Sequence, residues 1–124
     1  MYSIAFTDDA FEDVKALDGS IKNKLRKVLT KKLAMDPRGY GIPLRSPLHL
    51  YWKHEFAAHR VIYRIYEEKH LVVVCAIGPR KHGDASDVYK QFEALAQTGK
   101  VAQQIADVLG SLAPGKRKIE HPKR

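Results

Sequence analysis

Six side chains between positions 53 and 89 are of the types that can cleave RNA without a metal. Cleavage by the neighbouring 2′-hydroxyl needs a base that takes the hydroxyl proton, cations that stabilise the charged phosphoryl oxygens, and an acid that protonates the leaving 5′-oxygen. The carboxylate of Glu55 can be the base, and either His82 or Tyr89 can be the acid. Arginine suits the role of the cation because its guanidinium group contacts two oxygens at once. The cationic candidates are Lys53, Arg60 and Arg80.

Each of these side chains also has a simpler explanation. Glu55 opposite Arg60 fits an ordinary cross-strand ion pair, and spacing alone favours this pair over a catalytic base. The run Arg80–His82 can be no more than a basic loop. A tyrosine at the start of a helix, as Tyr89 is expected to be, more often packs than donates a proton. Each of these signals is weak by itself, and chemistry gains support because the residues are all predicted on one face of the domain.

Two strands joined by a tight turn position these residues. Apolar and polar side chains alternate over residues 51–56 and 59–66, as in half-buried strands, and Ala57-Ala58 is the predicted two-residue turn. The predicted opposite pairs are Phe56–His59, Glu55–Arg60 and Lys53–Ile62. One sheet face is the expected core and carries Leu50, Trp52, Phe56, Val61, Tyr63 and Ile65. The other face is basic and carries Tyr51, Lys53, Glu55, Arg60 and Arg64.

The third strand is predicted in the most apolar run of the chain, Leu71–Gly78, which is typical of a central strand covered on both faces. Arg80 leaves the end of this strand beside the basic face. Cys75, the single cysteine, lies in the run and is expected to be a buried, inert thiol. The histidines have no spacing typical of a metal site, so we expect no metal.

Two helices are predicted between a first strand at residues 2–6 and the hairpin. Thr7, Asp8 or Asp9 can cap the first helix, with Asp9 and Glu12 spaced as a capping box. The apolar side of that helix carries Phe11, Val14 and Leu17. A break at Asp18-Gly19-Ser20 starts the second helix, whose buried stripe consists of Ile21, Leu25, Val28, Leu29 and Leu33. Its remaining surface carries six lysines and arginines, which can be a solvated face or can bind RNA or an acidic partner.

Two further helices are predicted after the third strand. Asp84 or Ser86 can cap a helix over residues 85–96, and Gly99 interrupts it. A last short helix is indicated by the helical spacing of Val101, Ile105, Val108, Leu109 and Leu112. The chain from Pro114 onward is expected to be a basic, disordered tail.

The whole chain has 124 residues and a net charge of +8, which predicts one domain with a polyanionic partner. We expect an α+β fold. A small, mainly antiparallel sheet packs on an N-terminal helical hairpin in the order β-α-α-β-β-β-α, with an extra C-terminal helix. No signal peptide or membrane-spanning run is recognisable, so a cytoplasmic protein is expected.

The order and spacing of these segments resemble the RelE/ParE superfamily of bacterial type II toxins. The resemblance lies in Tyr51-Trp52-Lys53, in His59–Ile65, in the strand exit Ala76–Arg80 and in Asp87-Val88-Tyr89. It covers roughly residues 1–95, so residues 1–98 are predicted to be the toxin-like domain and residues 99–124 an added helix and basic tail.

The resemblance implies a function and roles for particular residues. RelE-type members are ribosome-dependent endonucleases that cut mRNA and are held inactive by a cognate antitoxin, without a cofactor. Lys53, Arg60, Arg80 and Tyr89 match functional positions of the family. Glu55 stands where RelE has a second lysine, which is more like the YoeB branch with its glutamate base, and His82 lies near a YoeB-type histidine. RNA contacts are expected from Lys22, Lys31, Tyr51, Arg64 and Lys81.

Two alternatives remain open at this point. ParE-type relatives keep the fold but poison DNA gyrase, although the basic residues and the tyrosine favour the RNase branch. A relative with an inactive site that only binds nucleic acid or regulates is the other alternative. The partners expected for the favoured branch are the antitoxin, the ribosome and mRNA, with no membrane.

Overall fold

A five-stranded sheet with the strand order β1-β5-β4-β3-β2 forms the centre of the protein. The computed structural model describes residues 1–80 and 87–112. The strands are β1 (Ser3–Phe6), β2 (Ile42–Pro43), β3 (Tyr51–Phe56), β4 (His59–Tyr66) and β5 (Leu71–Pro79). β1 pairs with β5 in parallel and all other pairs are antiparallel. The predicted α+β class and the three consecutive central strands are therefore confirmed, and β2 is an edge strand that the sequence did not predict.

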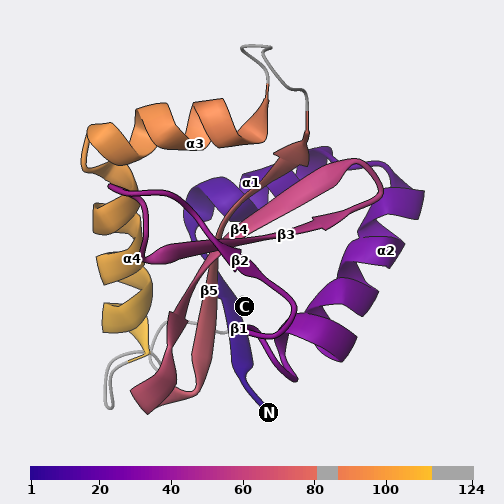
Figure 1. Ribbon diagram of the computed structural model, residues 1–124, viewed down its shortest axis with the longest axis horizontal. Coiled ribbons are helices and arrows are strands. Elements are labelled where there is room, and N and C mark those ends of the chain that lie inside the picture. The colour runs from indigo at the N-terminus through magenta and orange to yellow at the C-terminus, as the bar shows by residue number, and fades with distance from the viewer. Residues whose placement is uncertain (81–86, 113–124) are drawn as a thin grey trace.

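Helices cover both faces of this sheet (Figure 1). On one face lie α1 (Asp8–Ala16), α2 (Gly19–Val28) and the π-helical turn η1 (Leu29–Leu33) that continues α2. On the other face lie α3 (Val88–Gln97) and α4 (Lys100–Ser111). A short 3₁₀ turn, η2 (Glu67–Lys69), joins β4 to β5. The early helical hairpin is where it was predicted, but α3 and α4 add a third layer over the face that the sequence presented as open and basic.

Two apolar clusters separate these layers. Val61 and Tyr63 of β4 and Val72 and Val74 of β5 pack against Leu25 and its neighbours on the α2 side, with Trp52, Phe56 and Ile65 partly buried there. Ile62, Val73 and Cys75 pack against Phe92 of α3 and against Val101 and Ile105 of α4. The predicted core face of the hairpin is confirmed except for Leu50, which precedes β3 and is 55% exposed.

The start of α1 differs from the predicted capping box. Thr7 is the cap, and its side-chain oxygen accepts a hydrogen bond from the Ala10 amide. Glu12 pairs with Lys15 instead of reaching back to the cap. Ala10 is the buried residue of the helix, whereas Phe11, which was expected on one side of the helix with Val14 and Leu17, is 55% exposed. The predicted break at Asp18 is confirmed, because the Asp18 carboxylate caps α2 at the Ile21 amide.

The helix after β5 begins at Val88, with Asp87 as its cap. The predicted start near residue 85 was therefore too early, and the proposed caps Asp84 and Ser86 lie outside the described residues, as does the tail from residue 113. α4 buries Val101 and Ile105 as its spacing predicted, while Leu112 at its end is 41% exposed.

The turn Ala57-Ala58 fixes the hairpin register. Both alanines have positive φ angles, 46° and 60°, as the two central residues of a type I′ turn require. Phe56 lies opposite His59, Glu55 opposite Arg60 and Lys53 opposite Ile62. The predicted register is thus confirmed, although alanine is a strained residue in this region of backbone space.

Replacing Ala57-Ala58 by Asn-Gly is expected to stabilise the protein, since these residues adopt positive φ at a lower energetic cost. We expect the free energy of unfolding to rise by about 1–2 kcal/mol, measured by urea denaturation. Ala94→Gly is the matched control, because Ala94 is exposed inside α3 and glycine there costs about 1 kcal/mol. A fall in stability of the Asn-Gly variant would contradict the left-handed turn.

The buried hydroxyl of Tyr63 holds the chain segment that leads into β2. It donates a hydrogen bond of 2.7 Å to the Pro37 carbonyl oxygen. Gly41 passes so close that a Cβ atom there would lie 1.9 Å from the Tyr63 hydroxyl oxygen. Glycine is therefore required at position 41 by the side chain that faces it.

Gly41→Ala is expected to lower the free energy of unfolding by about 2 kcal/mol through overpacking. In a Tyr63→Phe background the same substitution is expected to cost less, because the atom nearest to the new methyl group is gone. Urea denaturation of the two single variants and the double variant measures this coupling. Equal costs in both backgrounds would rule out the contact as the cause.

Candidate functional site

Five of the six predicted catalytic residues lie together where β3, β4 and β5 meet the start of α3. Lys53 and Glu55 are on β3, Arg60 is opposite Glu55 on β4, and Arg80 follows the end of β5. Tyr89 is in the first turn of α3. Figure 1 shows the end of β5 and the start of α3 near one another at the top of the view. His82, the sixth, lies outside the described residues.

The Glu55 carboxylate is the centre of this group. Its Oε2 atom accepts a hydrogen bond of 2.9 Å from an Arg60 terminal nitrogen, and its Oε1 atom accepts one of 3.0 Å from Arg80. The Lys53 ammonium nitrogen lies 4.0 Å from Oε2. The ordinary cross-strand ion pair is therefore present, but it is part of a larger arrangement in which three cations surround one carboxylate. We call Lys53, Glu55, Arg60 and Arg80 the arginine cluster.

Arg60 is the buried member of the arginine cluster, with only 6% of its side chain exposed, against 39% for Arg80 and 38% for Glu55. A second carboxylate, Asp87, lies behind it, and its Oδ2 atom is 3.9 Å from the other Arg60 terminal nitrogen. Asp87 also caps α3 by accepting hydrogen bonds from the Tyr89 and Lys90 amides. It thereby ties the buried arginine to the helix that carries Tyr89.

A close approach of α3 to β5 makes this contact possible. Arg60 lies opposite Gly78 in the β4–β5 pair. A Cβ atom at Gly78 would lie 3.1 Å from Cβ of Val88, closer than side chains normally approach. Because position 78 has no side chain, the first turn of α3 packs directly on the strand, and Asp87 reaches Arg60.

Sequence reasoning missed the role of Asp87. The sequence did contain a signal for this cap. Apolar residues at helical spacing begin at Val88, and the position directly before a helix, here Asp87, is the preferred place for a capping aspartate. Two other cap candidates, Asp84 and Ser86, stood close by in the sequence. The three-dimensional arrangement reveals the role of Asp87, because its carboxylate lies beside the Arg60 guanidinium group.

Burial on its own would raise the pKa of Glu55. The hydrogen bond from Arg60, together with the charges of Arg80, Arg60 and Lys53, outweighs this effect and holds the pKa below the usual value for a glutamate. Glu55 is therefore ionised at neutral pH, as a general base must be. While both arginines hold it, however, each of its oxygens already accepts a hydrogen bond from a cation, and it is a weak acceptor for a further proton.

The tyrosines around the arginine cluster are packing partners of cations. The Arg60 guanidinium carbon lies 5.9 Å from the centre of the half-buried Tyr89 ring. Arg64 lies 5.5 Å from the Tyr51 ring centre and 4.8 Å from that of Tyr66. Tyr51 also makes an edge contact with Phe92, at 5.0 Å between ring centres. Tyr51 and Arg64, both expected to contact RNA, thus form one group with Tyr66 next to α3.

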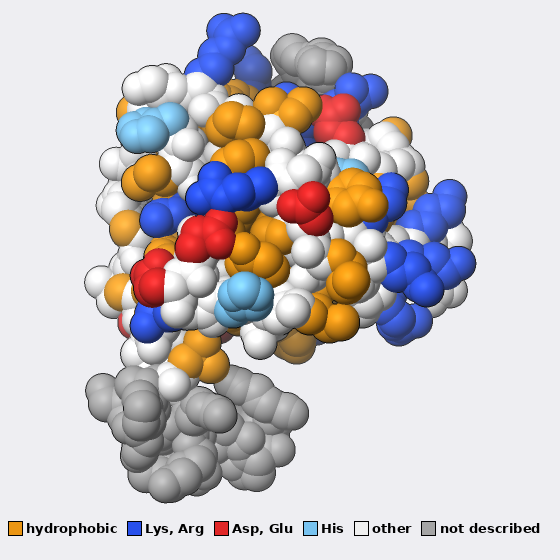
Figure 2. Space-filling model, turned by 60° about the horizontal axis from the view of Figure 1, so that its bottom comes forward, with side chains coloured by type: hydrophobic (Ala, Val, Ile, Leu, Met, Phe, Trp, Pro, Cys, Tyr) orange, Lys and Arg blue, Asp and Glu red, His pale blue; other side chains and the backbone are white. Residues whose placement is uncertain are grey.

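The other expected RNA contacts do not join this group. Lys22 and Lys31 belong to α2 and η1, which cover the opposite face of the sheet, and Lys81 lies outside the described residues. Figure 2 shows Lys and Arg side chains gathered on the right-hand side of the molecule, over α2. This basic surface belongs to another layer of the fold than the arginine cluster.

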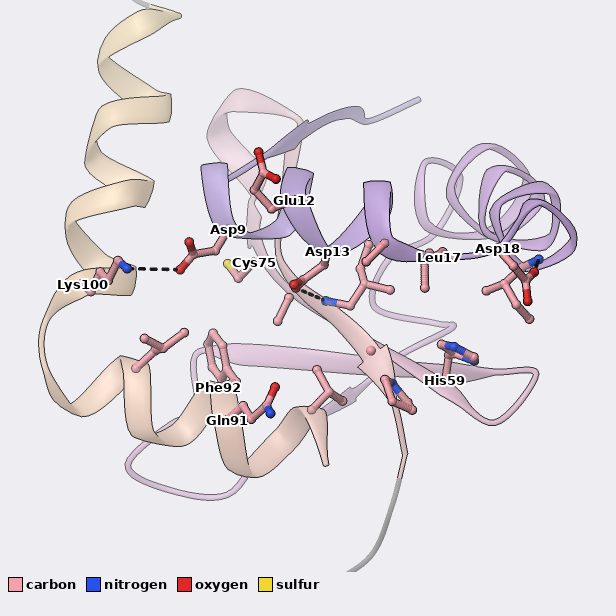
Figure 3. Close-up of a pocket in the computed structure, with 18 residues that line it drawn as sticks. Asp9, Glu12, Asp13, Leu17, Asp18, His59, Cys75, Gln91, Phe92 and Lys100 are labelled. Carbon is pink, nitrogen blue, oxygen red and sulfur yellow. Dashed lines mark hydrogen bonds and ion pairs between the residues drawn. The ribbon is translucent and has the colours of Figure 1, made fainter. Parts of the chain in front are cut away.

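A pocket of about 690 Å³ opens between α1 and α3 (Figure 3). Its floor includes Cys75 and Phe92, and Asp9, Asp13 and Asp18 stand along the α1 side. Burial raises the pKa of the Cys75 thiol to about 12, so this thiol is protonated and inert, as predicted. Carboxylates at the rim repel a phosphate backbone, and the arginine cluster is therefore the better candidate for binding RNA.

Within residues 1–80 and 87–112, no group of three or more His, Cys, Asp or Glu side chains is arranged to hold a metal ion. The helices described in those same ranges include none of the length and apolar character needed to cross a membrane.

We compared the chain with known proteins to find which family has this fold and this site. The sequence matches no protein-family model and no curated protein. Solved structures do match. A chain of the RelBE2 toxin–antitoxin complex from Mycobacterium tuberculosis is 28% identical with a TM-score of 0.61, over 64% of this chain and 91% of that one.

Two further structures share the fold at lower identity. The isolated RelE toxin from E. coli is 19% identical with a TM-score of 0.57, over 79% of this chain and 99% of that one. The YoeB/ParE toxin from Agrobacterium tumefaciens is also 19% identical, with a TM-score of 0.55, over 64% and 99% of the two chains. The helical hairpin α1–α2 on one face of the sheet, the three consecutive central strands followed by α3 and the likeness to the RelBE2 chain lead to one conclusion: this chain belongs to the RelE/ParE superfamily.

Proposed function

We propose that this protein is the toxin of a type II toxin–antitoxin pair and that it cuts mRNA on the ribosome by metal-free attack of the 2′-hydroxyl. The observation that carries the proposal is the convergence of Lys53, Arg60 and Arg80 on one point, which the Glu55 carboxylate holds. Two guanidinium groups and an ammonium group around a single anion are what a phosphoryl group with growing negative charge requires.

Each member of the arginine cluster has a role in the proposed reaction. Arg60 and Arg80 hold the phosphoryl oxygens, and Lys53 adds a third positive charge beside them. Glu55 takes the proton of the 2′-hydroxyl. Tyr89, whose ring stacks against Arg60, is the candidate acid within the described residues, and His82 is the other candidate.

The partners follow from the same proposal. The structural neighbours include complexes of a RelE-type toxin with its antitoxin, which supports a cognate antitoxin for this chain. A net charge of +8 supports binding to the ribosome and mRNA. Tyr51 and Arg64, on β3 and β4, are proposed as further contacts to RNA, and Lys22, Lys31 and Lys81 as separate ones.

Arg80→Ala is expected to reduce mRNA cleavage by a factor of roughly 10²–10³, because it removes one charge that stabilises the transition state. Arg80 is partly exposed, so the fold is expected to survive. The matched control is Arg38→Ala, which removes an arginine from another pair with a glutamate, Glu67, outside the arginine cluster. Cleavage is measured by mapping mRNA ends on translating ribosomes after induced expression, together with growth.

Three results would separate the alternatives. Growth arrest with new mRNA ends that Arg80→Ala abolishes and Arg38→Ala retains is the expected outcome. Arrest by the wild type with intact mRNA and a DNA-damage response would contradict cleavage and indicate a ParE-like gyrase poison. A wild type that neither arrests growth nor cuts mRNA would indicate a relative that only binds or regulates.

The low pKa of Glu55 predicts a pH dependence of stability. An acid whose folded-state pKa lies below its unfolded value stabilises the fold above the unfolded pKa, and this contribution is lost as the pH falls through the folded pKa. Glu55→Gln should therefore lose less stability than the wild type between pH 6 and pH 3, to be measured by urea denaturation at each pH. Parallel curves for the two proteins would show that the arginines do not hold Glu55 in solution.

A further inference from the structure

Arg60 has two carboxylate partners, and they differ in how firmly they are held. Asp87 is buried, with 7% of its side chain exposed, and its oxygen accepts hydrogen bonds from two amides at the start of α3. Glu55 has 38% of its side chain exposed and stands on the hairpin strand β3. Moving Asp87 would uncap a helix, whereas Glu55 can turn out into water.

A buried guanidinium group needs a permanent counter-ion, because an unpaired charge in the interior is strongly destabilising. Asp87 supplies one from the buried side, at 3.9 Å. Removal of Glu55 from the solvent side therefore does not leave Arg60 unpaired. Lys53, Arg60 and Arg80 then outnumber Asp87, and the place that Glu55 occupied retains a positive charge.

The two Glu55 oxygens each take one arginine, with Oε2 bound to Arg60 and Oε1 bound to Arg80. Two oxygens of a phosphate group can make the same pair of contacts. The Arg60 side chain also has a buried Nε–H that makes no hydrogen bond to any described residue. A phosphate group has more oxygens than a carboxylate. When it takes the place of Glu55, the Arg60 Nε–H is therefore available to donate one further hydrogen bond to it.

From these contacts we propose that Glu55 is an exchangeable anion that occupies a phosphate-binding site, while Asp87 is the fixed counter-ion that keeps Arg60 in position when Glu55 leaves. This inference deepens the proposed function, since it concerns the regulation of the same site. Glu55 inhibits the free site by competing with the substrate phosphate. Once displaced by the phosphate, its carboxylate is released from both arginines and becomes a better proton acceptor.

Binding of inorganic phosphate to the full chain tests this exchange without any need for cleavage. Glu55→Gln keeps the shape of the side chain and removes its charge. We expect it to bind phosphate roughly tenfold more tightly than the wild type, because two partly exposed ion pairs no longer oppose binding. The measurement is a calorimetric titration at constant ionic strength. Arg80→Ala in the Glu55→Gln background should abolish the gain.

Glu67→Gln is the matched control, since it removes the same charge from an arginine–glutamate pair outside the arginine cluster. Its phosphate affinity should stay within about twofold of the wild type. Equal gains in both variants would show an effect of net charge and overturn the proposal, as would no gain in Glu55→Gln. Tight phosphate binding by Glu55→Gln, together with intact mRNA in cells that express the wild-type protein, would keep the exchange and reject the nuclease.

Asp87 is a positioning residue in this proposal, and it has its own variant. Asp87→Asn retains a good helix cap and removes the fixed counter-charge. Glu55→Gln should then cost more stability in the Asp87→Asn background than in the wild type, because Arg60 loses both counter-ions. Urea denaturation of the four proteins measures this coupling. Additive costs would contradict the assignment of Asp87, since a residue that acts only as a cap would show no coupling to Glu55.

Discussion

The arrangement of the site depends on one constraint, the burial of the Arg60 guanidinium group between the sheet and α3. A buried cation must be paired, and here its two partners come from opposite sides: Asp87 from the helix and Glu55 from the neighbouring strand. The requirement links β3, β4 and α3. It also explains why α3 begins where it does, since its cap is the residue that neutralises Arg60.

Several local features of the fold bring Glu55 and Asp87 into contact with Arg60. A two-residue turn with positive φ angles at Ala57 and Ala58 sets Glu55 directly opposite Arg60. A glycine at position 78 lets α3 approach the strand next to Arg60. Arg80 then follows from the end of β5, where it reaches the same carboxylate from a third direction. Each of these local features would be unremarkable on its own, and together they surround one anion with three cations.

The hairpin and its register could be predicted from the sequence. Period-two alternation identifies the two strands, and a turn of two residues allows only one pairing of the residues of β3 with those of β4. Sequence reasoning also placed Glu55 and Arg60 on one face of the sheet, since strand parity determines the face, and it placed Arg80 beside that face because Arg80 follows the end of the third strand. It predicted the helices α3 and α4 but not the sheet face that they cover. The apolar stripe of a helix such as α4 shows which side of the helix is buried, but it does not show which face of the sheet that side packs on. The two-residue strand β2, half of it proline, is too short for any periodicity to indicate.

Burial was the property of the site that the sequence could not provide. From the sequence, Arg60 was a candidate cation for the phosphate or the partner of Glu55 in an ordinary cross-strand ion pair, and nothing indicated that its side chain is buried. Only the packing of α3 shows that Arg60 has 6% of its side chain exposed and that a second carboxylate serves it. That difference turns an ordinary ion pair into a site in which one anion is fixed and the other can be exchanged.

The most direct measurement is a crystal structure of the protein with an RNA fragment whose 2′-hydroxyl at the cleavage position is replaced by hydrogen. The exchange predicts two oxygens of one phosphate group, one within about 3 Å of Arg60 and the other within about 3 Å of Arg80, with the Glu55 side chain turned away from them and Asp87 still beside Arg60. A complex in which Glu55 remains bound to both arginines while the RNA lies elsewhere would contradict it.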